Sequence, residues 1–216
     1  MTQKSTFLVL GATGGTGRHF VTRALGDGHR VRTLVRTPAK VTFQHENLEV
    51  VHGSITDTLD IDALVHGVDF VISMLGDIGL QRTAKINTTF VKRLVPSMRR
   101  YGVKRFLYQA GGLSRPYGKA LSPALWMIRN TLARSFIPQH EDNEAVMEYL
   151  ATEANDIEWM VHRAAISSHG PSKGILERSK AGLSVATHYD CADYNYRTIM
   201  DTTAVHSSDL SRYAKL

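Results

Sequence analysis

The residues with the clearest chemical meaning form a glycine-rich turn near the start of the sequence. The turn follows the apolar run Thr6–Leu10 and precedes a stretch with helical spacing, and its residues are Gly11, Ala12, Thr13, Gly14, Gly15, Thr16 and Gly17. Gly11 permits a tight turn out of a strand, Gly14 lets the backbone approach a pyrophosphate, and Gly17 lets a helix pack closely on the strand. N–H groups at the start of that helix would bind the anion. The pattern predicts a dinucleotide site, with a purely structural glycine turn as the alternative.

The glycine spacing separates this turn from other phosphate-binding loops. It reads G-x-x-G-x-x-G, and no Lys-Ser or Lys-Thr pair follows the last glycine. In nucleoside triphosphatases that pair contacts the phosphates and the magnesium ion, so the sequence disfavours an ATPase.

Positive charge is concentrated in the same part of the chain. Residues 1–40 contain seven basic side chains and one acidic side chain, Asp27, whereas the remaining residues contain 19 of each sign. The basic residues are Lys4, Arg18, Arg23, Arg30, Arg32, Arg36 and Lys40. Clustered cations of this kind bind nucleic-acid backbones or small polyphosphates. Because the glycine turn lies in the same segment, we favour a small polyphosphate and expect no nucleic-acid partner.

The end of the second expected strand carries a basic residue where NAD-specific sites place an acid. Asp or Glu about 20 residues beyond the glycine turn binds the ribose hydroxyls of NAD. Here the position is Arg36, whose guanidinium suits the 2′-phosphate of NADP through paired N–H bonds, with Lys40 placed to assist. We therefore expect NADP(H) rather than NAD(H). The alternative is a solvated arginine at a strand end.

Two later segments follow expected strands, and therefore fall on the same edge of a parallel sheet. Ser54 and Ile55 follow the third strand, where an adenine pocket is expected. Met74, Leu75 and Gly76 follow the fourth strand, on the nicotinamide side. We expect all five to contact the cofactor.

Apolar runs and helical spacing alternate along the chain. The expected strands are Thr6–Leu10, Arg30–Val35, Leu48–Val51, Asp69–Leu75, Lys104–Tyr108 and Ile157–Val161, with Leu183–Thr187 as a seventh candidate. The expected helices are Gly14–Leu25, Thr58–Val65, Thr83–Arg100, Gln139–Ala151 and a short one over Ser207–Ala214. This alternation predicts an α/β, single-domain, doubly wound Rossmann fold over residues 1–216, with a parallel sheet of six to seven strands. Segments 111–138 and 163–182 are predicted as substrate-side loops, the first including a helix.

Composition limits the remaining classes of protein. At 216 residues, with 43% hydrophobic and 21% charged side chains, the chain fits one globular domain rather than a disordered or fibrous protein. Its single cysteine, Cys191, allows no internal disulfide and no multi-cysteine zinc site, and we expect no metal. No apolar stretch approaches the ~20 residues of a membrane span, and no signal peptide is recognisable. We expect a cytoplasmic monomer or homodimer without a membrane partner.

With these residues, the chain resembles the atypical short-chain dehydrogenase/reductases of the NmrA-like and biliverdin/flavin reductase group. The similar segments lie between Phe7 and Ile166, and they are LGATGGTG, TLVR, LEVVHGSITD, GVDFVISMLG, GVKRFLYQAGG and DIEWMVHRAAI. Their order is most similar to that of the small single-domain NADPH-dependent flavin reductases. The resemblance implies NADP(H) bound across the sheet edge, with a planar hydride acceptor, such as a flavin or a tetrapyrrole, over the nicotinamide.

The sequence differs from this group near the expected nicotinamide. The Thr-Ser pair at the end of the fifth strand is replaced by Ala110 and Gly111, with Gln109 before them. The Arg-Pro pair that often follows the sixth strand is reduced to Arg163 followed by alanine, and the acid expected after the third-strand glycine is Ser54. We expect Gln109, Ala110, Gly111 and Arg163 to line the nicotinamide side.

Catalytic residues are less clear than cofactor residues. None of the tyrosines has a lysine four residues later, so the Tyr-x-x-x-Lys pair of ordinary short-chain dehydrogenases is missing. Carbonyl reduction by that mechanism is not expected, but a delocalised acceptor such as a flavin needs no strong positioned acid. The candidate acids are Tyr117, Lys119, His140 and His162, each with a structural or solvated role as the alternative.

Two other motifs lack the context that their chemistry requires. Gly170–Gly174 matches G-x-S-x-G around Ser172 and is followed by Asp190 and His206, but no strand directly precedes the serine as in α/β-hydrolases. The segment His140–Glu144 begins like a zincin helix but has glutamate in place of the second metal-binding histidine. We expect neither a hydrolase nor a zinc enzyme.

Three functions remain open from the sequence. The favoured one is an NADPH-dependent oxidoreductase that transfers a hydride to a flavin, a tetrapyrrole, a quinone-like or another conjugated small molecule. The alternatives are a non-catalytic NADP(H)-sensing regulatory protein of the NmrA-like kind and a redox-neutral tailoring enzyme on the same scaffold. The fold alone does not separate them.

Overall fold

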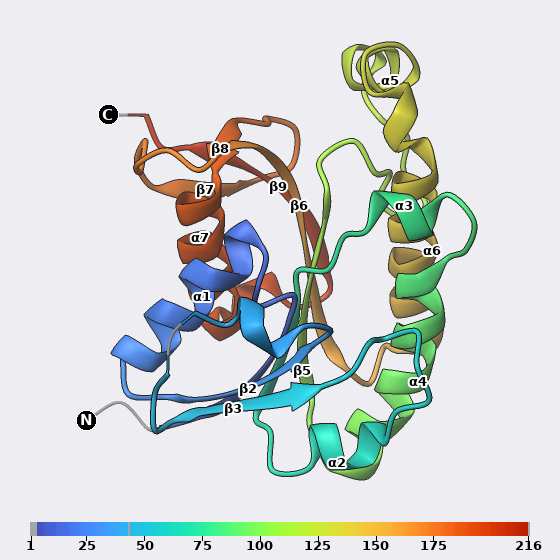
Figure 1. Ribbon diagram of the computed structural model, residues 1–216. Helices are drawn as coiled ribbons and strands as arrows, with labels where there is room; N and C mark the ends of the chain where they lie inside the picture. Colours follow the sequence, from blue (N-terminus) through green and yellow to red (C-terminus); the bar gives the residue numbers. More distant parts are fainter. Residues whose placement is uncertain (1–3, 43, 216) are drawn as a thin grey trace.

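A twisted sheet forms the centre of the computed structural model, and helices cover both of its faces (Figure 1). The structure describes residues 4–42 and 44–215, apart from the side chain of Ser167. Across these residues the sheet has nine strands in the order β3-β2-β1-β4-β5-β6-β9-β7, with β8 paired to β6. The strands are β1 (Thr6–Leu10), β2 (Arg30–Val35), β3 (Leu48–His52), β4 (Phe70–Ser73), β5 (Arg105–Gly111), β6 (Glu158–Ser168), β7 (Leu176–Ser179), β8 (Val185–Thr187) and β9 (Ser207–Tyr213). Every pairing is parallel except that of β7 with β9.

The helices form two layers around this sheet. They are α1 (Gly15–Gly26), α2 (Ile61–Val65), α3 (Ile78–Gln81), α4 (Ile86–Arg100), α5 (Pro123–Asn130), α6 (Ile137–Glu153) and α7 (His188–Met200), with the short 3-10 turns η1 (Pro38–Lys40), η2 (Arg134–Phe136) and η3 (Thr202–Ala204). Helices α1 and α7 lie side by side on one face, and α2, α4 and α6 cover the other (Figure 1). Within the described residues, no helix is long and apolar enough to cross a membrane.

Strand β1 shows how the sequence fills both layers. Phe7 and Val9 pack in the core beneath α1 and α7, whereas Leu8 and Leu10 pack in the core beneath α2, α4 and α6. All four side chains are buried. A strand covered on both faces is apolar at every position, which is why the short run Thr6–Leu10 is recognisable in the sequence. The predicted doubly wound α/β fold is confirmed.

The predicted sheet of six to seven strands is too small, and the predicted loop over 163–182 is wrong in part. Strand β6 continues to Ser168, and residues 176–179 form β7. The extra length of β6 has a partner in β8, where Ala165 pairs with Val185 and Ile166 with Ala186. The seventh strand expected over 183–187 is therefore real but short.

The segment Ser207–Ala214 is a strand rather than the predicted short helix. As β9 it pairs in parallel with β6, starting at Met160 and Ser207, and antiparallel with β7. Leu210 and Ser211 are buried in this position. Strand formation depends strongly on the neighbouring strands. Residues 207–213 have a weak pattern of their own, and pairing with the edge of β6 makes them a strand.

Helix α7 has no counterpart among the predicted helices. Its sequence is rich in residues of modest helix propensity, including Asp190, Tyr194 and Asn195. The Thr187 side chain accepts a hydrogen bond from the Asp190 N–H and so caps the helix. Packing against α1 buries its inner face, which outweighs the weak local preference. In contrast, the helix predicted within 111–138 is present as α5.

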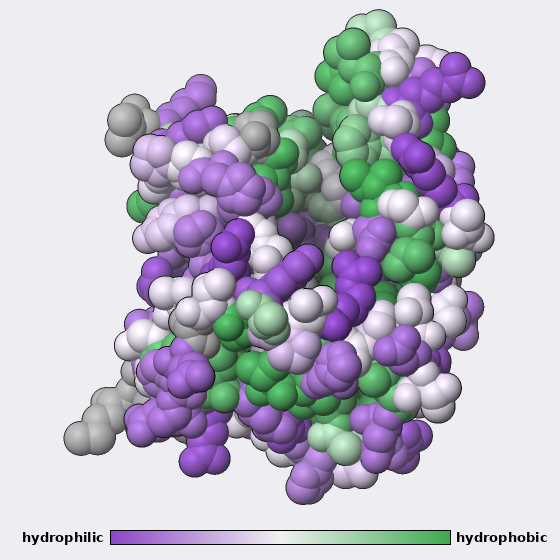
Figure 2. Space-filling model, viewed as in Figure 1, coloured by the Kyte–Doolittle hydropathy of each residue, from purple (hydrophilic) through white to green (hydrophobic). Residues whose placement is uncertain are grey.

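The strand order creates a crevice at the centre of the sheet. From β1 the chain moves outward through β2 and β3 in one direction, and from β4 through β5 and β6 in the other. Ligands of such folds bind outside the carboxyl ends of the strands, where the order reverses. The space-filling view is hollowed between the part built by α1 and α7 and the part built by α3 and α6 (Figure 2).

Candidate functional site

The glycine turn has the tight geometry that its sequence predicts. Gly11 has a φ of +90°, and a Cβ there would lie 2.7 Å from the Met74 carbonyl oxygen. A Cβ on Gly17 would lie 2.1 Å from the Gly11 carbonyl oxygen. Both distances are too short for any side chain, so glycine is required at the turn and where α1 crosses it.

Helix α1 begins with free backbone donors beside this turn. Gly14 is its N-cap and, among the described residues, no side chain caps it and no acid occupies its first turn. A Cβ on Gly14 would meet only the Gly11 carbonyl oxygen, at 3.2 Å, so the backbone is open to a ligand there. Uncapped N–H groups at the positive end of a helix bind phosphate well.

A histidine from α7 packs against the turn, and the sequence gives no sign of it. The His188 Nδ1 lies 3.0 Å from the Thr16 hydroxyl, and its ring would be 2.6 Å from a Cβ on Gly15. Burial lowers the pKa of His188, and the positive charges of His169, His19 and Arg18 lower it further. Thr16 and Gly15 therefore contact α7, which supports the turn from behind.

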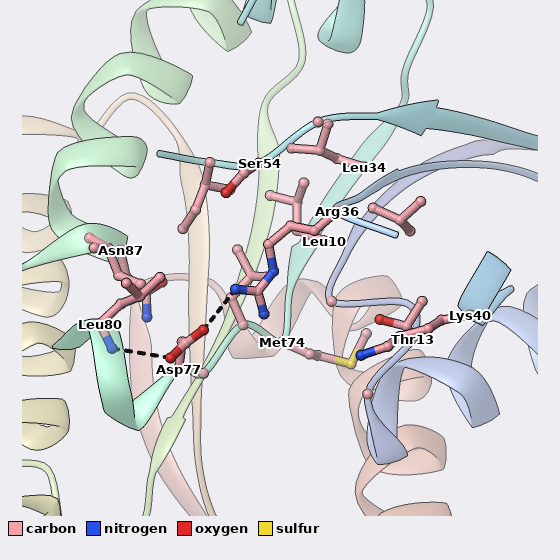
Figure 3. A pocket seen from close by; sticks show the side chains of 18 residues that line it. Leu10, Thr13, Leu34, Arg36, Lys40, Ser54, Met74, Asp77, Leu80 and Asn87 are labelled. Carbon is pink, nitrogen blue, oxygen red and sulfur yellow. Dashed lines mark hydrogen bonds and ion pairs between the residues drawn. The ribbon is translucent and has the colours of Figure 1, made fainter. Parts of the chain in front are cut away.

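A pocket opens above the carboxyl ends of the first four strands (Figure 3). Ten of the residues predicted to bind the cofactor line it: Gly11, Thr13, Gly14, Arg36, Lys40, Ser54, Ile55, Met74, Leu75 and Gly76. Gly53, the glycine before Ser54 in the segment predicted at the adenine, also lines it. Residues that sequence reasoning missed complete the lining: Leu10, Leu34, Val35, Asp77, Leu80, Ile86 and Asn87. The missed residues are mostly apolar or come from α3 and α4, whose approach to the strand ends depends on tertiary packing.

One ion pair extends across the pocket. Arg36 Nη1 donates a hydrogen bond to Asp77 Oδ2 at 2.8 Å, joining the end of β2 to the start of α3 (Figure 3). Asp77 Oδ1 accepts a hydrogen bond from the Leu80 N–H at 3.1 Å, as the N-cap of α3. The Leu80 N–H and the Arg36 guanidinium hold the pKa of Asp77 below its ordinary value. The carboxylate is therefore ionised at neutral pH.

The four nicotinamide-side residues predicted on β5 and β6, which are Gln109, Ala110, Gly111 and Arg163, do not line this pocket. Gln109 Oε1 accepts a hydrogen bond from Asn195 of α7 at 2.7 Å, and Ala110 is buried. A Cβ on Gly111 would lie 3.0 Å from the His140 ring. Arg163 is buried and donates to the Ser114 carbonyl oxygen at 3.2 Å, so its guanidinium ties β6 to the segment after β5.

Beside the pocket, a chain of buried side chains connects α4, β5 and α6. Asn87 Nδ2 donates to the Tyr108 hydroxyl at 3.1 Å, and that hydroxyl donates to Asn143 Oδ1 at 2.6 Å. Asn143 Nδ2 donates to Ser114 Oγ at 3.2 Å, and Ser114 Oγ lies 3.1 Å from His140 Nδ1. Within the described part of the chain, Asn87 Oδ1 and His140 Nε2 are buried without a partner. Each of these two atoms keeps the capacity for a hydrogen bond that the surrounding side chains do not use.

Of the four candidate acids, His140 is the one that lies beside the strand ends in this chain of hydrogen bonds. Ser114 Oγ accepts from Asn143 Nδ2 and lies 3.1 Å from His140 Nδ1, so the tautomer of the ring depends on whether the Ser114 hydroxyl donates to Nδ1 or accepts from it. Burial lowers the pKa of His140 to about 4, with a further contribution from the positive charge of Arg129. The ring is therefore neutral at pH 7, with one nitrogen that donates and one that accepts.

The other three candidate acids lie in different surroundings. His162 is fully buried, and both of its ring nitrogens have partners, Asn195 at 2.7 Å and Ser211 at 2.8 Å. That geometry supports a structural role between β6, α7 and β9. Tyr117 and Lys119 are exposed in the segment between β5 and α5.

The two motifs set aside from the sequence have structural explanations. Ser172 Oγ donates to Asp190 at 2.5 Å, while His206 Nε2 donates to the Ile157 carbonyl oxygen at 2.9 Å, so Ser172 and His206 do not pair with each other. Burial would raise the pKa of Glu144, but hydrogen bonds from Arg115 and Arg129 outweigh it and lower the pKa. In the part of the chain that the structure describes, no group of three His, Cys, Asp or Glu side chains is arranged to hold a metal ion.

These features fit a nicotinamide dinucleotide and agree with the comparison to known families. The NAD(P)H-binding family matches residues 11–193, which is most of the chain. The chain belongs to the NAD(P)H-binding family. The match begins at Gly11, the first residue of the glycine turn, and together with the relatives described next it confirms the predicted resemblance.

Individual relatives have names of oxidoreductases. A 3-beta-hydroxysteroid dehydrogenase from Mycolicibacterium neoaurum is 33% identical over 114 residues, covering 48% of this chain and 31% of that protein. An isoflavone reductase homolog from Zea mays is 33% identical over 132 residues, covering 56% of this chain and 40% of that protein. The matches thus span well under half of these longer relatives. The solved structure of ChuY, an anaerobillin reductase from Escherichia coli O157:H7, has a TM-score of 0.77 at 15% identity and covers 98% of both chains, which shows the shared fold.

Proposed function

We propose that this protein is an NADPH-dependent reductase that transfers a hydride to a conjugated small molecule, such as a flavin, a tetrapyrrole or a quinone. The observation that carries the proposal is the pocket in which the glycine turn meets Arg36 and Lys40. A diphosphate suits the uncapped start of α1, and a third phosphate needs further positive charge nearby. The reductase and dehydrogenase names of the relatives support the same class of reaction.

The chain's own residues account for binding of each part of the cofactor. The backbone of Gly11, Thr13 and Gly14 faces the diphosphate, while Arg36 and Lys40 face the 2′-phosphate. Apolar side chains that flank the pocket exclude water around the adenine: Leu34, Ile55, Leu75 and Leu80. Bound NADPH would supply the hydride.

The acceptor is proposed to lie over the carboxyl ends of β5 and β6, within the single domain and beside segment 111–138. A Cβ on Gly111 would lie 3.0 Å from the His140 ring there, and His140 Nε2, which in this proposal carries the ring proton, has no hydrogen-bond partner among the described residues. A neutral N–H donor can hold an acceptor oxygen without giving up its proton, so water completes the protonation. Helix α5 projects from the rest of the molecule (Figure 1), and its exposed apolar side chains Trp126 and Met127 suit contact with an apolar ring system.

The test separates binding from chemistry. Titration calorimetry with NADPH measures the affinity, and the loss of reduced-nicotinamide absorbance with FMN, a linear tetrapyrrole or a benzoquinone measures turnover. We expect micromolar or tighter binding and faster oxidation with at least one acceptor than in an enzyme-free control. Absence of heat with both NADPH and NADH would overturn the proposal.

A second candidate is a non-catalytic NADP(H) sensor that binds a partner protein. The observation in its favour is that His140 and His162 are both neutral at pH 7, and no Tyr-x-x-x-Lys pair is present. Tight NADPH binding without oxidation by any conjugated acceptor would favour this function. A redox-neutral enzyme would instead convert its substrate without net consumption of NADPH.

A further inference from the structure

The Arg36–Asp77 pair places a carboxylate inside a pocket suited to a polyanion. Asp77 is the one acidic residue in the pocket lining, which also contains the cations Arg36 and Lys40. A carboxylate repels phosphate, so it weakens a cofactor site unless it has a specific role there. The pair joins the end of β2 to the start of α3, and both residues belong to the pocket lining (Figure 3).

The two partners differ in how firmly they are held. Asp77 caps α3 through the Leu80 N–H, and its own N–H donates to Gln81 Oε1 at 3.1 Å. Gln81 is in turn bound to the buried Asp142 at 2.8 Å, so the position of Asp77 is fixed by the fold. The Arg36 side chain is 61% exposed, and within the described residues Asp77 is its hydrogen-bond partner. Arg36 is therefore the partner that can change position.

We propose that Asp77 competes with the 2′-phosphate of NADP(H) for Arg36 and thereby sets how strongly the pocket prefers NADP(H) over NAD(H). This inference rests on the proposed function. When a 2′-phosphorylated dinucleotide binds, Arg36 leaves the single carboxylate charge and donates to the more highly charged phosphate. When NAD(H) binds, nothing replaces the carboxylate, so the pair stays closed. Breaking the Arg36–Asp77 pair offsets part of the favourable free energy of the Arg36–phosphate interaction, which reduces the preference for NADP(H).

The Asp77→Asn variant isolates this competition. Asparagine caps helices as well as aspartate does, so α3 keeps its cap while the charge is lost. With Arg36 released, we expect NADPH to bind about two- to fivefold more tightly, since an exposed ion pair is worth at most about 1 kcal/mol. NADH affinity should change less than about twofold by the same reasoning. Titration calorimetry at fixed salt measures both dissociation constants without requiring turnover.

Two further variants make the result specific. Asp60→Asn removes the same charge from another helix N-cap, on α2, that lies outside the pocket lining, and is expected to leave the NADPH/NADH ratio unchanged. In an Arg36→Gln background, Asp77→Asn should no longer tighten NADPH, because the competition requires both partners.

The outcomes distinguish this inference from the proposed function. Three results with Asp77→Asn would overturn the competition. Equal tightening of NADPH and NADH binding would indicate a general charge effect, and unchanged binding would indicate that Asp77 only caps α3. Weaker binding of either coenzyme would indicate a direct contact between Asp77 and the nucleotide. Persistence of the tightening in the Arg36→Gln background would overturn it as well. Failure of the unmodified protein to bind any dinucleotide would instead remove the proposed function, and the inference with it.

Discussion

Among the residues that line the pocket, Arg36 and Lys40 carry its positive charge. The sequence points to them because they follow the second strand, at the distance from the glycine turn where the adenosine ribose is recognised. It does not point to Asp77, because no local pattern says that the start of α3 faces the end of β2. Charge at this site is therefore balanced by a residue 41 positions away in the chain.

Reversing the charge of Arg36 tests its assigned role. Arg36→Glu removes charge-assisted hydrogen bonds to a 2′-phosphate and adds repulsion, so NADPH affinity should fall by roughly 10- to 100-fold. NADH affinity should fall much less, because NADH has no phosphate at that position. Fluorescence titration of the reduced nicotinamide gives both values. An equal loss for the two coenzymes would contradict the assignment of Arg36.

At the scale of elements, the contact between α1 and the glycine turn positions the site. The helix can start where the diphosphate is expected only because Gly17 lets its backbone approach Gly11. Helix α7 then supports the turn through His188 and Thr16. The first contact was predictable from glycine spacing, whereas the second joins residues 172 positions apart and depends on a helix without a clear local pattern.

Replacing Gly17 with alanine tests this packing. The new methyl group would lie 2.1 Å from the Gly11 carbonyl oxygen, so α1 must shift away from the turn. We expect Gly17→Ala to lower the free energy of unfolding by about 1–3 kcal/mol and to weaken NADPH binding by about tenfold or more. Urea unfolding and calorimetry measure the two effects.

Gly26, in the last turn of the same helix, provides the matched control. A Cβ there has nothing within 4 Å. Gly26→Ala should raise the free energy of unfolding by up to about 1 kcal/mol and leave NADPH binding unchanged. Loss of binding in both variants would indicate that any added methyl group on α1 disturbs the site.

At the scale of the whole molecule, buried histidines couple stability to pH. Burial lowers the pKa of His162 from 6.5 to about 4, although a hydrogen bond with Asn195 opposes the shift. His140 is lowered to about 4 as well. Between pH 6.5 and 4 the unfolded chain binds protons that the folded protein excludes, so stability falls as pH decreases through this window.

The His162→Gln variant measures one of these contributions. It should be less stable at pH 7.5 by about 1–3 kcal/mol, because buried hydrogen bonds are lost. Between pH 7.5 and 5.5, however, it should lose about 1.4 kcal/mol less stability than the unmodified protein, because one fewer proton is taken up on unfolding. Urea unfolding at both pH values gives the difference, with the exposed His52→Gln as the control for loss of a histidine. An identical pH dependence in His162→Gln and the unmodified protein would show that His162 does not titrate as described.

The glycine turn, the central strands and the charge that follows the second strand could all be predicted from the amino-acid sequence. These are local properties, because a strand buried on both faces must be apolar throughout and a tight turn near an anion must use glycine. Four features became visible only in the folded chain: strand β9, helix α7, the contact of His188 with the glycine turn and the pairing of Arg36 with Asp77. Each of these depends on neighbours distant in the chain, whose burial and charge outweigh weak local preferences.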